Sequence, residues 1–237
     1  MKLIKLGAAL AALLTLAACA GQAEIPYDRT TALNNKTIGL LTPAWPSGPS
    51  SFLASNPGQS LGLIGALVNA GIQTGRESDL KLILDNQKID ANMEFVTALT
   101  ANLEAKGFTI VPITADAKRG GYLKKYPAVG ANSVDSYLDI AVTQYGYLAA
   151  GIGSDNPYRP WCEANVKLVR ASDGAVLMQD SVTYNSWLDL KNRVKISPDP
   201  EYAFAKWTDA KDVPEKAAQG VSIAAKKSAD AIGELLK

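Results

Sequence analysis

Histidine is absent from the 237 residues of the sequence, and this absence excludes several classes of function. Without an imidazole there is no Ser-His-Asp or Cys-His nucleophile, no histidine-ligated zinc or haem, and no imidazole acid–base relay. The enzyme designs that remain are carboxylate pairs, Ser-Lys dyads and metal sites built from carboxylates.

Cysteine is almost as scarce, because the chain carries only Cys19 and Cys162. A single pair of cysteines, of which the first has another predicted role, excludes a disulfide framework. Free cysteine is among the most buried residue types, so we expect Cys162 to be buried, with contact to a partner as the alternative.

A strong charge of one sign is also missing, since 24 Lys and Arg stand against 23 Asp and Glu. No global basic field favours nucleic acid, and no polybasic block favours an anionic lipid surface. We therefore expect no nucleic-acid partner. Apolar residues make up 47% of the chain, which is enough to form a hydrophobic core.

The N-terminus carries an apolar run, Leu6–Leu16, preceded by two lysines and followed by Ala17 and Ala18. The run has the length of a secretory h-region and is too short to span a bilayer, which takes about 20 apolar residues. We predict a signal peptide over residues 1–18. An ordinary signal cleaved nearby and an uncleaved anchor are the alternatives.

The residues Leu16-Ala17-Ala18-Cys19 resemble the lipobox of bacterial lipoproteins. This resemblance implies that Cys19 is diacylated through its sulfur, becomes the mature N-terminus and is acylated again on its amine. Two or more acyl chains anchor a protein stably in a bilayer. In that family an Asp after the cysteine tends to retain the protein at the inner membrane, so Ala20 favours the outer membrane. The resemblance thus implies a periplasm-facing protein of the bacterial envelope.

The mature chain divides into a tether and one domain. Residues 19–36 are polar and lack a clean period, so we interpret them as a lipidated tether. Residues 37–237 predict a single α/β domain of mixed type. The short apolar runs 37–43 and 108–113 are typical of strands, and the Pro-, Gly- and Ser-rich segment 44–60 predicts a long loop.

A helix is predicted between those two strands. Asp90 fits its N-cap and Gly107 fits the residue after its end. The apolar stripe recurs at helical spacing and consists of Met93, Val96, Leu99 and Leu103.

The segment Ser60–Gly75 is apolar yet rich in glycine. Gly62, Ala66 and Ala70 lie at a spacing of four residues, which allows close backbone approach along one helix face. We interpret the segment as a closely packed core helix, with contact to a membrane or a partner as the alternative.

The second half of the chain predicts an antiparallel meander. In residues 136–150, Leu138, Ile140 and Val142 alternate with a second set of residues that includes Asp139 and Tyr145. Residues 162–185 predict a hairpin that turns at Ser172–Gly174.

A C-terminal helix follows the irregular segment 186–213. Pro214 fits its first position, and its predicted buried stripe is Ala217, Val221, Ala224, Ser228, Ile232 and Leu235.

The element order over residues 37–237, with the patterns YLDIAVTQYGY and AxVxLVxAxDGxVL, resembles the small α/β-sandwich domains of the TolB N-terminus and the curli-secretion lipoprotein. This resemblance implies a central mixed sheet packed by helices. The long Pro-rich loop and the glycine-studded segment depart from that group, so we carry no secretion-channel role over.

Catalytic candidates are few. Ser78 and Lys81 match the Ser-Xaa-Xaa-Lys motif of penicillin-binding enzymes, but its companion motifs are absent and Ser78 also fits a helix cap. Asp135 and Asp139 are candidates for a glycosidase-type carboxylate pair. The segment 151–153 (GIG) lacks the third glycine of a dinucleotide loop, so no cofactor is predicted, and no metal site either.

Binding candidates are more numerous. Residues 116–130 mix Lys118, Arg119, Lys124 and Lys125 with tyrosines, a composition that suits a phosphate, a glycan or simply a solvated loop. Aromatic residues and arginine in Pro- and Gly-rich loops are typical of interfaces, and the candidates for partner binding are Trp45, Phe52, Tyr158, Arg159 and Trp161.

The function that these features predict is a non-enzymatic accessory or assembly factor, anchored by Cys19, that binds another envelope component. A cell-wall or glycan hydrolase and a small-ligand-binding domain are the alternatives. A hydrolase requires Ser78 and Lys81, or two acids, to meet in a cleft.

Overall fold

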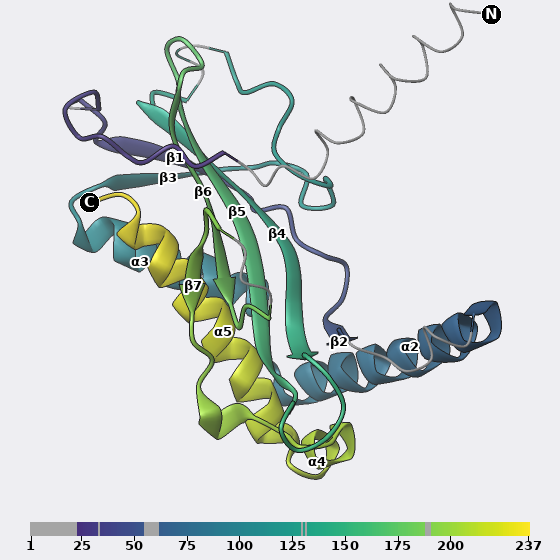
Figure 1. The fold of residues 1–237 in the computed structure, drawn as a ribbon. Coiled ribbons are helices and arrows are strands. Elements are labelled where there is room, and N and C mark those ends of the chain that lie inside the picture. Colours follow the sequence, from purple (N-terminus) through teal and green to yellow (C-terminus); the bar gives the residue numbers. More distant parts are fainter. Residues whose placement is uncertain (1–22, 33, 55–61, 129, 131, 188–190) are drawn as a thin grey trace, which may run out of the picture.

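The computed structural model describes residues 23–32, 34–54, 62–128, 130, 132–187 and 191–237 (Figure 1). The predicted signal peptide, the lipobox, Cys19 and Ala20 lie outside these residues. The strands are β1 Thr37–Leu41, β2 Ser50–Leu53, β3 Thr109–Ile113, β4 Ser136–Ala149, β5 Arg159–Arg170, β6 Val176–Tyr184 and β7 Val194–Ile196. The helices are α2 Gly62–Gln87, α3 Ala91–Ala105, α4 Trp207–Asp212 and α5 Pro214–Glu234, with a 3₁₀ turn η3 at Pro200–Tyr202.

The strands form one mixed sheet in the order β3-β1-β4-β5-β6-β7, with β2 paired to the end of β4. The strands β4, β5 and β6 make the predicted antiparallel meander, whereas β1 runs parallel to both β3 and β4. Gly174 turns the β5–β6 hairpin at φ +75°, a conformation that glycine adopts without strain. The predicted mixed α/β fold with a C-terminal helix is confirmed.

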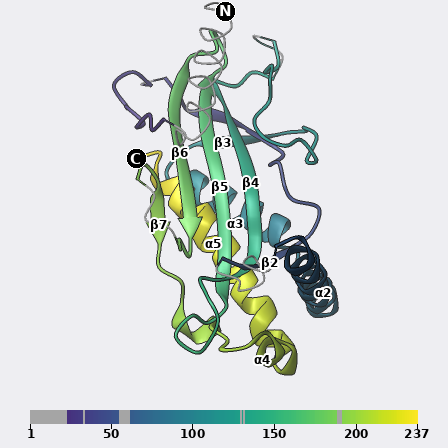
Figure 2. The ribbon, with the colours of Figure 1, turned by 45° about the vertical axis from the view of Figure 1, so that its right-hand side comes forward.

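One face of the sheet, the helix face, is covered by α3 and α5 (Figures 1 and 2). Small residues let α5 approach closely. A Cβ on Gly220 would lie 2.3 Å from the Tyr147 hydroxyl, and one on Gly233 would meet Asn102 of α3. The predicted stripe of α5 is buried except at its end, where Leu236 replaces the half-buried Leu235.

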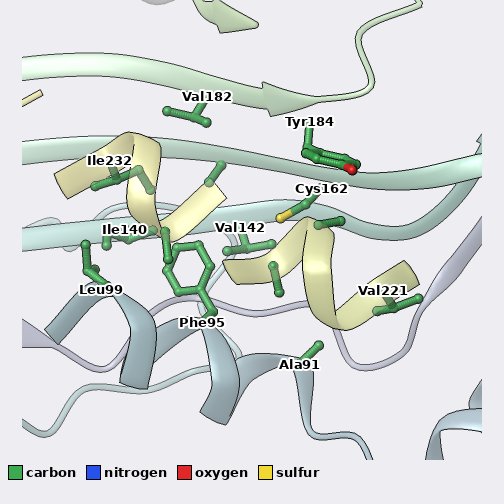
Figure 3. Packing of buried hydrophobic residues seen from close by; sticks show 14 of the residues in the cluster. Ala91, Phe95, Leu99, Ile140, Val142, Cys162, Val182, Tyr184, Val221 and Ile232 are labelled. Carbon is green, nitrogen blue, oxygen red and sulfur yellow. The ribbon is translucent and has the colours of Figure 1, made fainter. Parts of the chain in front are cut away.

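The helix α3 begins and ends as predicted. Asp90 accepts a hydrogen bond from the Met93 amide at 2.9 Å, and Gly107 has φ +89°. Met93 itself is 62% exposed, so its predicted place in the stripe is wrong. Phe95 is buried instead (Figure 3), because it precedes Leu99 by one turn whereas Met93 points about 120° away from Leu99.

A bulge in β4 also changes one predicted face. The register with β5 shifts between Val142 and Gln144, which brings Tyr145 opposite the core residue Cys162. Simple alternation predicts that Tyr145 lies on the face of Asp139. Because of the bulge, it packs on the helix face instead.

Two segments predicted to be irregular contain secondary structure. The segment 44–60 includes β2, which approaches β4 so closely that a Cβ on Gly146 would lie 2.1 Å from the Ser50 carbonyl oxygen. The segment 186–213 includes β7, η3 and α4. These short elements pair with or pack against distant residues, and such partners leave no local period in the sequence.

The first half of α2 extends beyond the sheet (Figures 1 and 2). Ala70, Gly71 and Ile72 are exposed, and no atom lies within 4 Å of the place that a Cβ on Gly71 would take. Close core packing is therefore wrong for the described part of Ser60–Gly75. Side chains of residues 62–69 lie outside the description.

The segment 23–36 is not a free tether. Ile25 forms an antiparallel bridge with Gln179 of β6, and Asn35 accepts a 2.6 Å hydrogen bond from the buried Ser136 hydroxyl. From residue 23 onward, the described part of this segment belongs to the folded body.

Candidate functional site

Three of the five predicted partner-binding residues lie on strands. Phe52 is on β2, and both Arg159 and Trp161 are on β5, so their predicted loop position is wrong. The pairing of β2 with the end of β4 brings Phe52 next to Trp161, with ring centroids 6.1 Å apart.

An aromatic groove forms around these two rings. The ring of Trp187, in the segment predicted to be irregular, lies 6.3 Å from that of Phe52. The three rings, with Gln73, Gln144 and Glu163, line a cavity of about 560 Å³. Trp187 is not among the binding residues that the sequence predicts. The one sequence signal for it is a large aromatic side chain in a polar segment.

The polar lining of the groove is only partly satisfied. Arg193 donates hydrogen bonds of 2.9 Å to both Glu163 and the Thr183 hydroxyl, so the two charges of the ion pair offset each other. Gln144 accepts from the Ser50 hydroxyl at 2.7 Å. Trp161 is only 7% exposed, yet its indole N–H finds no acceptor among the described residues.

These features together are typical of a binding surface. Trp187 is 43% exposed, so a large apolar ring faces solvent at the rim of the groove. A buried donor without an acceptor is costly. Flat aromatic surfaces that carry a polar N–H are enriched at interfaces.

The other two predicted residues are packed elsewhere. Trp45 is half-buried with its ring 5.5 Å from Phe95 and 5.2 Å from Tyr145. Tyr158 is buried, forms a bridge with Phe204 and lines a separate cavity of about 460 Å³. The structure therefore brings Phe52 and Trp161 together, with Arg159 on the same strand as Trp161, and leaves Trp45 and Tyr158 outside the groove.

The predicted Ser-Lys dyad is not assembled. The Ser78 hydroxyl donates to the Thr74 carbonyl oxygen at 2.9 Å, and Lys81 pairs with Asp85 at 2.6 Å. Each side chain thus makes its contact along the exposed surface of α2, and neither activates the other.

The two candidate acids also have other partners. Asp135 accepts from the amides of Lys36 and Thr37 at 2.9 and 2.7 Å. Asp139 lies four residues further along the extended chain, about 13 Å away. Glycosidase carboxyl groups lie roughly 5–9.5 Å apart, so these two acids do not form such a pair.

Asp139 holds the predicted basic loop against the second face of the sheet, which we call the loop face. Its carboxylate is fully buried and pairs with Arg119 at 2.7 Å. The Leu123 amide and the Tyr126 hydroxyl donate to its other oxygen at 2.7 and 3.1 Å. We name residues 114–128 the covering loop, and it is a docked element rather than a solvated one.

The buried position predicted for Cys162 is confirmed, since the side chain is 0% exposed on the helix face. Burial raises the pKa of its thiol to about 12. The thiolate is the reactive form of cysteine, so this residue offers no nucleophile at neutral pH.

Within the described residues, none of the helices combines the length and the apolar character that a membrane crossing requires. Comparison with known proteins finds no matching protein-family model and no matching curated protein.

Among solved structures, the chain is similar to a PelC dodecamer from Paraburkholderia phytofirmans, with 14% identity over 91% of this chain and 93% of that one and a TM-score of 0.38. It is also similar to protein XCC0632 from Xanthomonas campestris, with 11% identity over 90% and 85% of the two chains and a TM-score of 0.42. The lipoprotein GNA1162 from Neisseria meningitidis shares 13% identity over 62% and 81% of the chains, with a TM-score of 0.35. Likenesses this distant carry no argument about function.

Proposed function

We propose that the protein is a non-enzymatic envelope lipoprotein, anchored in the outer membrane by acylated Cys19, that binds another envelope component in the aromatic groove. The observation that carries the binding role is the cluster of Phe52, Trp161 and Trp187, with its exposed ring and its unpartnered buried indole N–H. The lipobox residues Leu16–Cys19 support the anchor.

The non-enzymatic role is supported by how the catalytic candidates are engaged. Ser78 and Lys81 each bond elsewhere on α2, and Asp139 is buried in an ion pair. Glu163, the acid of the groove, is paired with Arg193. These side chains act as structural partners of their neighbours, while the groove offers aromatic surface for recognition.

The test places a photo-crosslinking phenylalanine analogue at Trp187 in the full-length protein and irradiates intact cells. We expect an adduct of one discrete mass, weakened when Phe52→Ala removes the neighbouring ring. Val213 is a matched control, because it is 45% exposed against 43% for Trp187 and lies between α4 and α5.

Labelling with radioactive palmitate tests the anchor separately, with Cys19→Ala as its control. Crosslinking at Val213 as strong as at Trp187, or none at either position, contradicts the groove as the binding site. A wild-type protein that incorporates no palmitate contradicts the anchor.

A further inference from the structure

The first described residues lie at the edge of the sheet beside β6. Gln179 and Ile25 exchange two backbone hydrogen bonds of 2.8 Å, and Gln179 Nε2 donates to the Ala23 carbonyl oxygen at 2.9 Å. Gln179 lies directly opposite Lys167 of β5, and paired residues project from the same face. The Lys167 amine sits 4.3 Å from the ring of Tyr122 in the covering loop, which identifies that face.

Chain length limits how far this edge of the domain can stand from an anchored lipid. Four residue steps separate Cys19 from Ala23, and an extended chain spans at most ~3.6 Å per residue, so their Cα atoms lie within about 14 Å. This step rests on the proposed acylation of Cys19.

The covering loop lies over the same part of the sheet. Asp139, which binds the loop through Leu123 and Tyr126, is the register partner of Lys167, and Lys167 is the partner of Gln179. Two strand spacings, about 10 Å, therefore separate the loop's attachment point from the edge where Ala23 is held.

Two lysines stand at the outer surface of this loop. Lys124 and Lys125 lie between Leu123 and Tyr126, two of the three loop residues that bind Asp139, and both are exposed. Neither forms an ion pair within the described part of the chain. The exposed acid Glu24 lies next to Ala23 in the chain. Its single negative charge is outnumbered by the two positive charges of Lys124 and Lys125.

We propose that Lys124 and Lys125 contact anionic lipid headgroups when Cys19 is inserted, so that the loop face is turned toward the bilayer. The short connection allows the lysines to approach to the range over which a charged surface acts at physiological salt, about 8 Å. The aromatic groove lies on the same face, because Trp161 and Lys167 are six residues apart on β5 and an even separation keeps both side chains on one face.

The test inserts the acylated full-length protein from outside into preformed vesicles of phosphatidylcholine, with or without phosphatidylglycerol. A membrane-impermeant reagent acetylates lysines, and mass spectrometry measures the rate at each position. Lys227 is the internal control, because it is exposed on α5 on the opposite side of the sheet. We expect Lys124 and Lys125 to react about threefold more slowly relative to Lys227 in anionic vesicles only, with the protection lost at high salt.

Charge reversal gives a second readout. Deuterium uptake of the covering loop should fall when the wild-type protein or Lys227→Glu binds anionic vesicles, but not when Lys124→Glu/Lys125→Glu binds. Equal labelling of all three lysines in both vesicle types, on protein whose Cys19 peptide carries the acyl mass, overturns the orientation and leaves the anchor intact. An unacylated Cys19 peptide instead contradicts the proposed function.

Discussion

The two faces of the central sheet are covered by opposite means. On β4 the neighbours Asp139 and Ile140 are both 0% exposed. Ile140 packs among apolar residues of α3 and α5 on the helix face (Figure 3), whereas Asp139 is covered by an irregular loop through an ion pair and two hydrogen bonds. A non-repetitive segment can thus bury a strand residue as completely as a helix does when that residue's charge is paired within the segment.

The difference predicts how each face fails. Apolar packing is spread over many contacts, so one small truncation costs little. On the loop face, three hydrogen bonds from the covering loop converge on the Asp139 carboxylate, so we expect its removal to loosen that loop.

The largest effect is expected for Asp139→Ala. It leaves the Arg119 guanidinium buried without its counter-charge, which should cost about 3–5 kcal/mol of unfolding free energy. Urea denaturation measures the loss, and trypsin should cleave after Lys124 and Lys125 faster than in the wild type. Arg119→Met/Asp139→Leu, which removes both charges, should recover part of the stability. Trypsin cleavage at the wild-type rate in the single variant is the contrary result.

A smaller effect is expected for Tyr126→Phe, which removes one of the three hydrogen bonds to Asp139. A bond to a charged acceptor in this half-buried place should contribute about 1.5 kcal/mol. Urea denaturation at neutral pH measures it. An unchanged urea midpoint in Tyr126→Phe would contradict a stabilising hydrogen bond from the Tyr126 hydroxyl to Asp139.

The same variant makes a pH prediction. Burial, and then the nearby Asp139 carboxylate, raise the pKa of the Tyr126 phenol above its usual value. A raised pKa means that the folded state keeps the proton, so this contribution is complete below pH ~10 and is lost as pH rises through the folded value. The stability gap between the wild type and Tyr126→Phe should therefore narrow above pH ~10, and a constant gap would argue against the pKa shift.

On the helix face, Ile140→Val should cost about 1 kcal/mol and leave the tryptic pattern of the covering loop unchanged. Denaturation and proteolysis on the same sample measure both. Faster cleavage after Lys124 and Lys125 in this variant would show that the two faces are coupled and not independent.

The smallest effect concerns Cys162. Because it is buried and its thiol pKa is raised to about 12, a thiol reagent should label the folded protein only as fast as the protein opens. Labelling should become fast in urea, where the thiol is exposed. Fast labelling in native buffer would mean that the packing between β5 and α5 is looser than the structure shows.

Local patterns predicted those elements whose signals lie within a few residues. The cap at Asp90, the turn at Gly174 and the start of α5 at Pro214 each depend on a single side chain acting on its own backbone. The alternation along β4 predicted which residues share a face as far as the bulge after Val142. It did not predict that the face of Asp139 would be covered.

The sequence predicts only part of the groove, because its aromatic residues come from segments that are far apart in the chain. Their positions near Pro and Gly make Phe52 and Trp161 candidates for binding, but the contact between their rings depends on the pairing of β2 with β4. Gly146 permits this pairing because it leaves room for Ser50. Trp187 joins them from a segment without a periodic pattern.

By itself, the sequence determined the order of the main strands and helices, the hairpin and the lipobox-like motif, because propensity, capping and short motifs act over a few residues. Only the tertiary structure decided that Asp139 binds the covering loop, that residues 23–25 are held by β6, and that three aromatic rings form a groove. Each of these depends on contacts between residues far apart in the chain, and the free energy of such contacts arises only when the fold brings both partners together.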